Sequence, residues 1–141
     1  MSIKKILVFL LLTVTLLLSA CGGATELPEG VDVDISKLSG TVLYGRLYDM
    51  VTHGDQYEGK VVRMTGTMNQ FPVTNRGVEV GVLYSCYIAD GEGCCSQGVE
   101  FVLPEGSTYP PIGQEITVEG VWNNYKLYGI DRYRLLDAKL R

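Results

Sequence analysis

The chain contains few of the residues that nucleic-acid-binding proteins and most enzymes concentrate at their sites. It has one His and one Trp, and its 12 Lys and Arg residues stand against 16 Asp and Glu, a formal net charge of −4. No segment gathers positive charge, so the surface repels phosphate backbones and nucleic acid is not expected as a partner. The chain also lacks a phosphate-cradling loop, a nucleotide fingerprint and a recognisable nucleophile–base pair. These absences favour a protein that is not an enzyme.

Only one long apolar run is present, at residues 6–18, directly after Lys4 and Lys5. Its length suits the core of a secretion signal and is short for a transmembrane helix. The following Leu-Ser-Ala-Cys, which ends at Cys21, resembles the lipobox of bacterial lipoproteins. That resemblance implies that residues 1–20 are a signal peptide and that Cys21 is diacylated. The acyl chains would hold the protein on the extracytoplasmic face of the cell membrane.

The remaining chain divides into a short polar segment and one domain. Removal of residues 1–20 leaves 10 basic residues against 16 acidic ones, a formal charge of −6. Residues 21–38 are rich in Gly and acidic residues and poor in bulky apolar ones, which predicts a lipid-anchored tether. Residues 39–141 are long enough for a single domain with its own core.

The domain begins with a helical pattern. Four apolar residues recur at helical spacing: Leu43, Leu47, Met50 and Val51. We predict a helix over 41–53, with Ser39 as its N-cap and Gly54 as its stop signal. His53 lies at the end of this helix, where we expect it to interact with the last carbonyl groups and not with a ligand.

After the helix the apolar period changes from helical spacing to two. The alternation predicts five strands, near 60–71, 77–89, 98–103, 114–123 and within 126–138. The segment Asp-Gly-Glu-Gly at 90–93 predicts a turn between the second and third strands.

Two of these strands share a pattern that indicates a barrel. Residues 59–68 and 113–122 each have a Gly before the strand and a second Gly, Gly66 or Gly120, inside it. A Gly within a strand often marks a bulge or the sharp bend of a barrel corner. We therefore predict a mainly β fold, a small five-stranded OB-like barrel preceded by one α-helix. A small β-sandwich is the alternative.

Three cysteines surround the predicted turn at 90–93. One interpretation is a disulfide from Cys86 to Cys94 or Cys95, which would pin the hairpin and leave one free thiol. Adjacent strand residues face opposite sides, so only one of the two neighbouring cysteines fits well. A second interpretation is that the cysteines are buried free thiols that serve as small core residues.

A third interpretation is a zinc site made by Cys86, Cys94 and Cys95. Zinc favours four tetrahedral ligands from Cys, His and carboxylates. The candidates for a fourth ligand are Asp90, Glu92 and His53. The spacing does not match a standard zinc finger.

Four aromatic residues near the C-terminus are candidates for a ligand-binding face: Trp122, Tyr125, Tyr128 and Tyr133. On one side of a barrel they would stack on flat ligands, as aromatic residues of OB-folds do. Strand aromatics also serve as core residues, and the sequence leaves both interpretations open.

The segments 48–62 and 86–101 resemble a group of lipoproteins from Gram-positive anaerobes of the clostridial type, which has no established activity. The most specific part is the run Cys-Cys-Ser-Gln-Gly-Val-Glu-Phe that begins at Cys94. The domain is also distantly similar to the extracytoplasmic, OB-like part of a membrane protein family found beside permeases, some of them linked to zinc supply. These resemblances imply an OB-like fold, an extracytoplasmic location and a distant association with zinc supply.

Three functions remain open at this point. The first is a non-enzymatic binding domain that recognises an extracytoplasmic protein or glycan through its barrel. The second is a zinc-binding or zinc-handling lipoprotein that uses Cys86, Cys94 and Cys95. The third is a thiol-redox protein that uses the adjacent cysteines.

Overall fold

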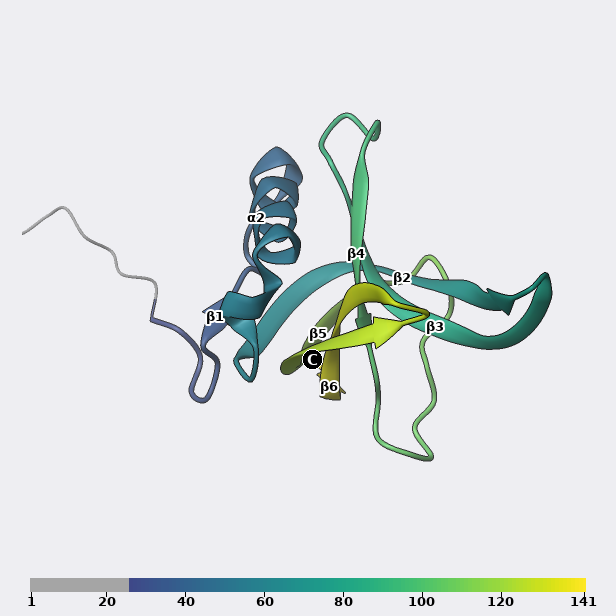
Figure 1. Ribbon diagram of the computed structural model, residues 1–141. Coiled ribbons are helices and arrows are strands. Elements are labelled where there is room, and N and C mark those ends of the chain that lie inside the picture. The colour runs from purple at the N-terminus through teal and green to yellow at the C-terminus, as the bar shows by residue number, and fades with distance from the viewer. Residues whose placement is uncertain (1–25) are drawn as a thin grey trace, which may run out of the picture.

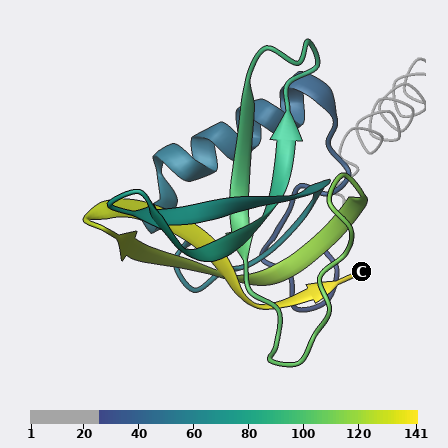
Figure 2. The ribbon, with the colours of Figure 1, turned by 90° about the vertical axis from the view of Figure 1, so that its right-hand side faces the viewer.

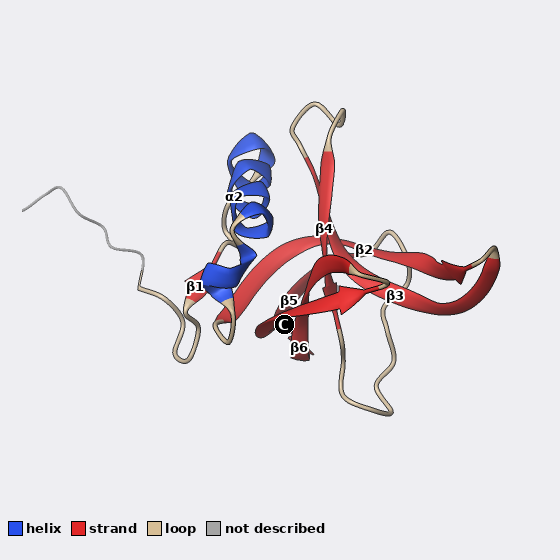
Figure 3. Ribbon diagram, in the orientation of Figure 1, coloured by secondary structure: helices blue, strands red, loops and turns tan. Residues whose placement is uncertain are grey.

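A computed structural model describes residues 26–141 and shows a closed five-stranded β-barrel with one helix before the barrel strands (Figures 1 and 3). The predicted signal peptide and Cys21 lie outside the described residues. Within residues 26–141, no helix is long and apolar enough to cross a membrane. The predicted mainly β, OB-like fold is confirmed, and the sandwich alternative is not.

The elements follow the order expected from the sequence, with two short additions. In chain order they are β1 (Val33–Asp34), α2 (Gly40–Thr52), the 3₁₀ helix η2 (Gly54–Tyr57), β2 (Val61–Asn75), β3 (Val78–Ala89), β4 (Ser96–Phe101), β5 (Glu115–Leu127) and β6 (Ile130–Leu140). The five long strands match the five predicted ones. The alternation did not reveal β1 and η2, because each is too short to show a period.

The barrel closes through the pairing of β2 with β5, the first and fourth of its five long strands. The sheet order is β1-β2-β3-β4-β6-β5, and β5 also pairs with β2. All barrel contacts are antiparallel except the one between β4 and β6, which is parallel. This closed Greek-key arrangement is that of an OB-fold.

Gly66 and Gly120 lie where the sequence predicted bends. A Cβ on Gly66 would come within 2.6 Å of the Tyr87 carbonyl oxygen, and one on Gly120 within 2.8 Å of the Leu136 carbonyl oxygen. The pairing of β5 with β6 shifts register between Glu119 and Val121, so Gly120 occupies a bulge. Glycine lets neighbouring strands approach closely at both points.

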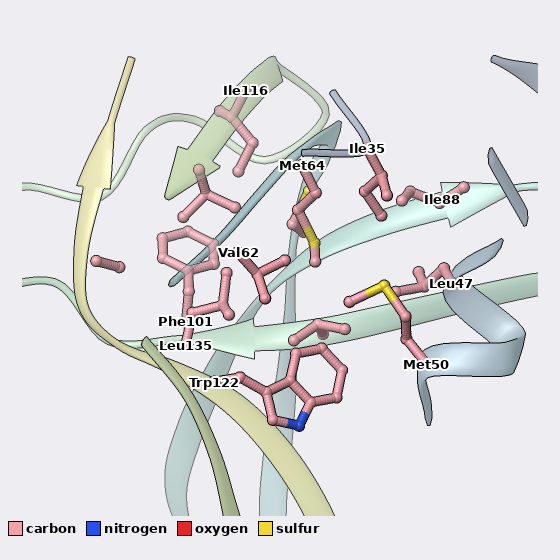
Figure 4. Packing of buried hydrophobic residues seen from close by; sticks show 14 of the residues in the cluster. Ile35, Leu47, Met50, Val62, Met64, Ile88, Phe101, Ile116, Trp122 and Leu135 are labelled. Atoms are coloured by element: carbon pink, nitrogen blue, oxygen red, sulfur yellow. The ribbon is translucent and has the colours of Figure 1, made fainter. Parts of the chain in front are cut away.

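The core fills the barrel and extends beneath helix α2. Trp122, Phe101 and Met64 are almost completely buried and point into the same interior (Figure 4). Leu47 and Met50 of α2 add to this cluster and are fully buried. The helix therefore closes the barrel with the apolar stripe that its sequence predicted.

Helix α2 begins and ends close to the predicted positions, but Gly54, the predicted stop signal, begins η2 and does not cap the helix. Ser39 occupies the N-cap with an extended backbone, although its side chain makes no capping hydrogen bond. At the other end, His53 Nδ1 lies 3.2 Å from the Asp49 carbonyl oxygen and 3.0 Å from the Asp49 carboxylate. The prediction that His53 interacts with the end of its own helix is confirmed.

The predicted tether is shorter than residues 21–38. Val31 and Ile35 are buried, and Val33 pairs with Val62 in the parallel contact between β1 and β2. The Ile35 amide also donates to the Arg63 carbonyl at 2.9 Å. This segment therefore belongs to the folded domain, because β2 offers it an open edge and the core offers an apolar site.

Candidate functional site

Two long hairpins project from the same side of the barrel. The hairpin β2–β3 turns at Arg76 and Gly77, and the hairpin β5–β6 turns at Tyr128 and Gly129 (Figures 1 and 2). All four turn residues have positive φ, which is the signature of tight two-residue hairpin turns. Such turns keep the strands paired to their tips, so both hairpins are extended walls and not loose loops.

A groove of about 610 Å³ lies between these walls, on the outer face of β3 and β4. Its apolar sides include Phe71 and Leu83 from the first hairpin and Ile130 from the second. Its floor includes Ser85 of β3 and Glu100 of β4. In OB-folds the outer face of the second and third strands, between these two hairpin loops, is the ligand-binding face.

Strand alternation explains why the floor is polar. Cys86 and Val99 pair across β3 and β4 and point into the core. Ser85 and Glu100 are the neighbouring pair and therefore point outward, into the groove. The same alternation that builds the core thus places a hydroxyl and a carboxylate together on the outer face.

Glu100 is held by two donors from the second hairpin. It is 6% exposed, accepts a hydrogen bond from the Tyr125 hydroxyl, and pairs with Arg132 Nε at 2.5 Å. The Arg134 guanidinium lies 4.4 Å from the centre of the Tyr125 ring. Burial and the Glu100 carboxylate raise the pKa of Tyr125 to about 12, so this hydroxyl remains a donor at physiological pH.

Unlike the Glu100 carboxylate, the Ser85 hydroxyl has no hydrogen-bond partner among the described residues. The residue is 2% exposed. A buried hydroxyl without a partner costs about 1–3 kcal/mol. A ligand group that reached Ser85 Oγ would recover this cost.

Apolar side chains are exposed on the hairpin that carries Tyr128. Tyr128 is 59% exposed and Ile130 is 64% exposed, and both line the groove. Tyr128 is the first residue of the two-residue turn, and its φ of +50° is the one that this turn requires. Exposed apolar groups around a polar floor are typical of a binding surface.

The four aromatic candidates do not form one ligand face. Trp122 is fully buried in the core, where it stacks on Tyr133 with ring centres 5.5 Å apart, and its Nε1 donates to Asn124. Tyr125 supports the groove floor through Glu100, and only Tyr128 lines the groove. Trp122 was a wrong candidate because its position in β5 faces the barrel interior.

Sequence reasoning missed Ser85, Glu100 and Arg132 as groove residues. Their signal is weak, because a polar residue that alternates with apolar ones also marks an ordinary solvent-facing position. Only the register between strands and the position of the second hairpin show that these residues meet.

The cysteines divide into two separate environments. Within the described residues Cys86, Cys94 and Cys95 are all free. Cys86 lies in the core. The pairing of β3 with β4 ends at Ala89 and Ser96, and Ala89 is three residues, or about 10 Å along the strand, from Cys86. Cys94 and Cys95 lie in the loop beyond this last pair. A disulfide requires Cα atoms within about 7 Å. The predicted disulfide is therefore wrong, and Cys86 does not join a metal site with the other two.

Cys94 and Cys95 instead meet Asp90. The Cys94 Sγ lies 3.1 Å from Asp90 Oδ2 and 3.6 Å from Cys95 Sγ, and one donor atom from each residue lies within 4.8 Å of the others. This cluster does not include Glu92 or His53, the other two candidates for a fourth ligand. The sequence predicted the location of this cluster and offered Asp90 as a candidate ligand, but it wrongly included Cys86.

The thiol environments give no support to a redox or nucleophilic role. The hydrogen bond to Asp90 raises the pKa of Cys94 to about 11, and burial raises that of Cys86 to about 12. Catalytic thiols have lowered pKa values, because the thiolate is the nucleophile.

Searches of protein-family models, curated proteins and solved structures return no match to this chain.

Proposed function

We propose that this protein is a lipid-anchored, extracytoplasmic binding domain whose groove holds an extended peptide segment of a partner protein. The observation that carries this proposal is the pair Ser85 and Glu100 on the floor of a groove with apolar walls. Anchoring through Cys21 follows from the lipobox resemblance, and it would hold the domain at the membrane surface.

The volume of the groove suits a short segment of a larger ligand. A volume of about 610 Å³ lies within the roughly 300–1,000 Å³ typical of ligand sites. The walls are paired strands that are formed before the ligand arrives, so the protein itself loses little conformational entropy on binding.

The walls suit the apolar side chains of a peptide. Val73, Leu83, Leu127 and Ile130 present aliphatic surface that matches such side chains. The rings of Phe71 and Tyr128 also line the groove and can stack on aromatic side chains or on a sugar ring, so a glycan is the competing ligand in the test.

On the floor, the unpartnered Ser85 hydroxyl has almost no exposed surface, so the groove must open slightly before this hydroxyl can donate to a peptide carbonyl. The Glu100 carboxylate is paired with Arg132, so the floor presents no unpaired negative charge to the carbonyl oxygens of a peptide.

The test is a selection of binders from a displayed library of random linear peptides, in parallel with a glycan array. The selected peptides are then measured against two matched variants, Ile130→Asp in the groove wall and Val42→Asp on α2. Val42 is 66% exposed and Ile130 is 64% exposed, so the two changes add equal charge at equally exposed positions. Val42 does not line the groove.

We expect Ile130→Asp to weaken peptide binding at least tenfold, which corresponds to about 1.4 kcal/mol, and Val42→Asp to leave it unchanged. Equal effects of the two variants would reject the groove as the binding site. Binding to glycans alone, sensitive to Ile130→Asp, would keep the site and replace the ligand.

The anchoring is tested separately by membrane fractionation and intact mass. We expect the chain to carry acyl chains on Cys21, and the Cys21→Ser variant to lack them and keep its signal segment. A protein whose mass shows an unmodified Cys21 would overturn the anchoring without affecting the groove.

A further inference from the structure

The loop between β3 and β4 carries the only group of three potential metal-ligating side chains found among the described residues: Asp90, Cys94 and Cys95. It is separate from the groove described above, since none of the three lines it. Gly91 of the same loop packs beside Thr41 at the start of α2, so the loop rests on the domain.

The backbone brings the three donors together. The Asp90 amide donates to the Cys95 carbonyl at 2.9 Å, and the Gly93 amide donates to the Asp90 carbonyl at 3.1 Å. Gly93 has a φ of +71°, which glycine adopts without strain. This reversal at Gly93 returns Cys94 toward the Asp90 side chain, so local hydrogen bonds set the positions of the donors.

The distances between donors are close to those of a tetrahedral zinc site. With Zn–S near 2.3 Å and Zn–O near 2.1 Å, tetrahedral geometry requires about 3.8 Å between two sulfurs and about 3.6 Å between a sulfur and an oxygen. The observed separations are 3.6 Å for the two sulfurs and 3.1 Å for Cys94 Sγ and Asp90 Oδ2. Small side-chain rotations would open the cluster enough for an ion.

The Asp90 carboxylate has a further feature that points to a ligand. Its Oδ1 is buried and makes no hydrogen bond with the described residues. A buried oxygen without a partner is costly, and a cation beside the carboxylate would compensate it.

We propose that Asp90, Cys94 and Cys95 bind one zinc ion, with the fourth coordination position open to water or to a donor from another molecule. Two thiolates and a carboxylate are ligands that suit a borderline-soft divalent ion. Both cysteines are exposed, so the ion is reached from solvent and exchanges readily. An open fourth position and an exposed location are the properties of a site that acquires or transfers zinc.

The competing chemistry for adjacent cysteines is a disulfide between them. A disulfide requires an S–S distance of about 2.05 Å, whereas Cys94 and Cys95 are separated by 3.6 Å. It also leaves Asp90 without a role in the loop. Zinc binding accounts for all three donors.

The experiment uses the full chain, purified in detergent, reduced, stripped of metal and then titrated with Zn²⁺ and, as a spectroscopic probe, with Co²⁺. The variants are Cys94→Ser, Cys95→Ser and Asp90→Asn. Two controls accompany them: Glu92→Gln removes a carboxylate from the same loop, and Cys86→Ala removes the core thiol. Circular dichroism checks that each variant folds.

We expect one Zn²⁺ per chain, a thiolate-to-cobalt charge-transfer band typical of tetrahedral sites, and at least a tenfold loss of affinity in the three ligand variants. Glu92→Gln and Cys86→Ala should bind as the unchanged protein does. No tight binding, an equal loss in Glu92→Gln, or an intact mass two hydrogens short without metal would overturn the proposal. Because groove variants leave this loop intact, its failure is distinguishable from failure of the peptide-binding proposal.

Discussion

Ser85 and Glu100 face each other across β3 and β4 on the outer surface of the barrel, yet each is less than a tenth exposed. Residues that point away from a small barrel are normally solvated. Here Tyr125 and Arg132 of the second hairpin cover Glu100, and the polar pair becomes the floor of a groove.

The contacts of Glu100 predict a measurable contribution to stability. Glu100→Ala leaves the Tyr125 hydroxyl and the Arg132 guanidinium without their acceptor, so we expect the free energy of unfolding to fall by about 1–3 kcal/mol. Chemical denaturation measures this change. The control is Asp131→Ala, which breaks an ion pair with Lys126 whose side chains are 66% and 70% exposed. That change should cost less than about 0.5 kcal/mol, and equal effects would show that Glu100 is not held as described.

The close packing around Gly66 predicts that adding a single methyl group there destabilises the fold. In Gly66→Ala the new Cβ would lie 2.6 Å from the Tyr87 carbonyl oxygen and 2.8 Å from Cys86 Sγ, so β2 and β3 must separate. We expect a loss of at least about 2 kcal/mol in unfolding free energy. Gly81→Ala is the matched control in the same hairpin, because nothing lies within 4 Å of its added Cβ. A small loss in Gly66→Ala would contradict the close approach of the two strands.

The contacts of Glu119 with two arginines predict that the fold loses stability at acidic pH. Hydrogen bonds from Arg141 and then Arg63 lower the pKa of Glu119 from 4.5 to about 2. Because the folded state lowers this pKa, its stabilisation is complete above about pH 4.5 and is lost as the pH falls toward 2. Melting temperatures measured from pH 6 to pH 2 should therefore fall more steeply for the unchanged protein than for Glu119→Gln. Parallel curves would show that the two arginines do not hold this carboxylate.

The two cysteine environments predict different thiol reactivity. Cys94 and Cys95 are exposed, whereas Cys86 is fully buried. In the metal-free folded protein, two of these three thiols should react with a maleimide, and the third should react only after unfolding. Intact mass and peptide mapping count and locate the adducts. Rapid labelling of Cys86 in the folded state would contradict its place in the core.

The periodicity of the chain was enough to predict much of this fold. The stripe of Leu43, Leu47 and Met50 produced the expected helix, and period-two alternation produced the five long strands, because burial of one face requires these spacings. The glycines at 66 and 120 indicated closure of the barrel, since a bent strand needs a residue without a side chain. The turn at 90–93 placed Cys94 and Cys95 near Asp90, although the sequence grouped them with the wrong cysteine.

The remaining features depend on contacts between residues far apart in the chain. The register of β3 with β4 places Cys86 inside and Ser85 outside, and a shift of one residue would exchange them. Arg132 reaches Glu100 only because β6 lies beside β4. The sequence by itself therefore determined the elements and the barrel, through local periodicity and glycine placement. Only the tertiary structure decided the groove and the membership of the cysteine cluster, because both depend on which strands become neighbours and in which register.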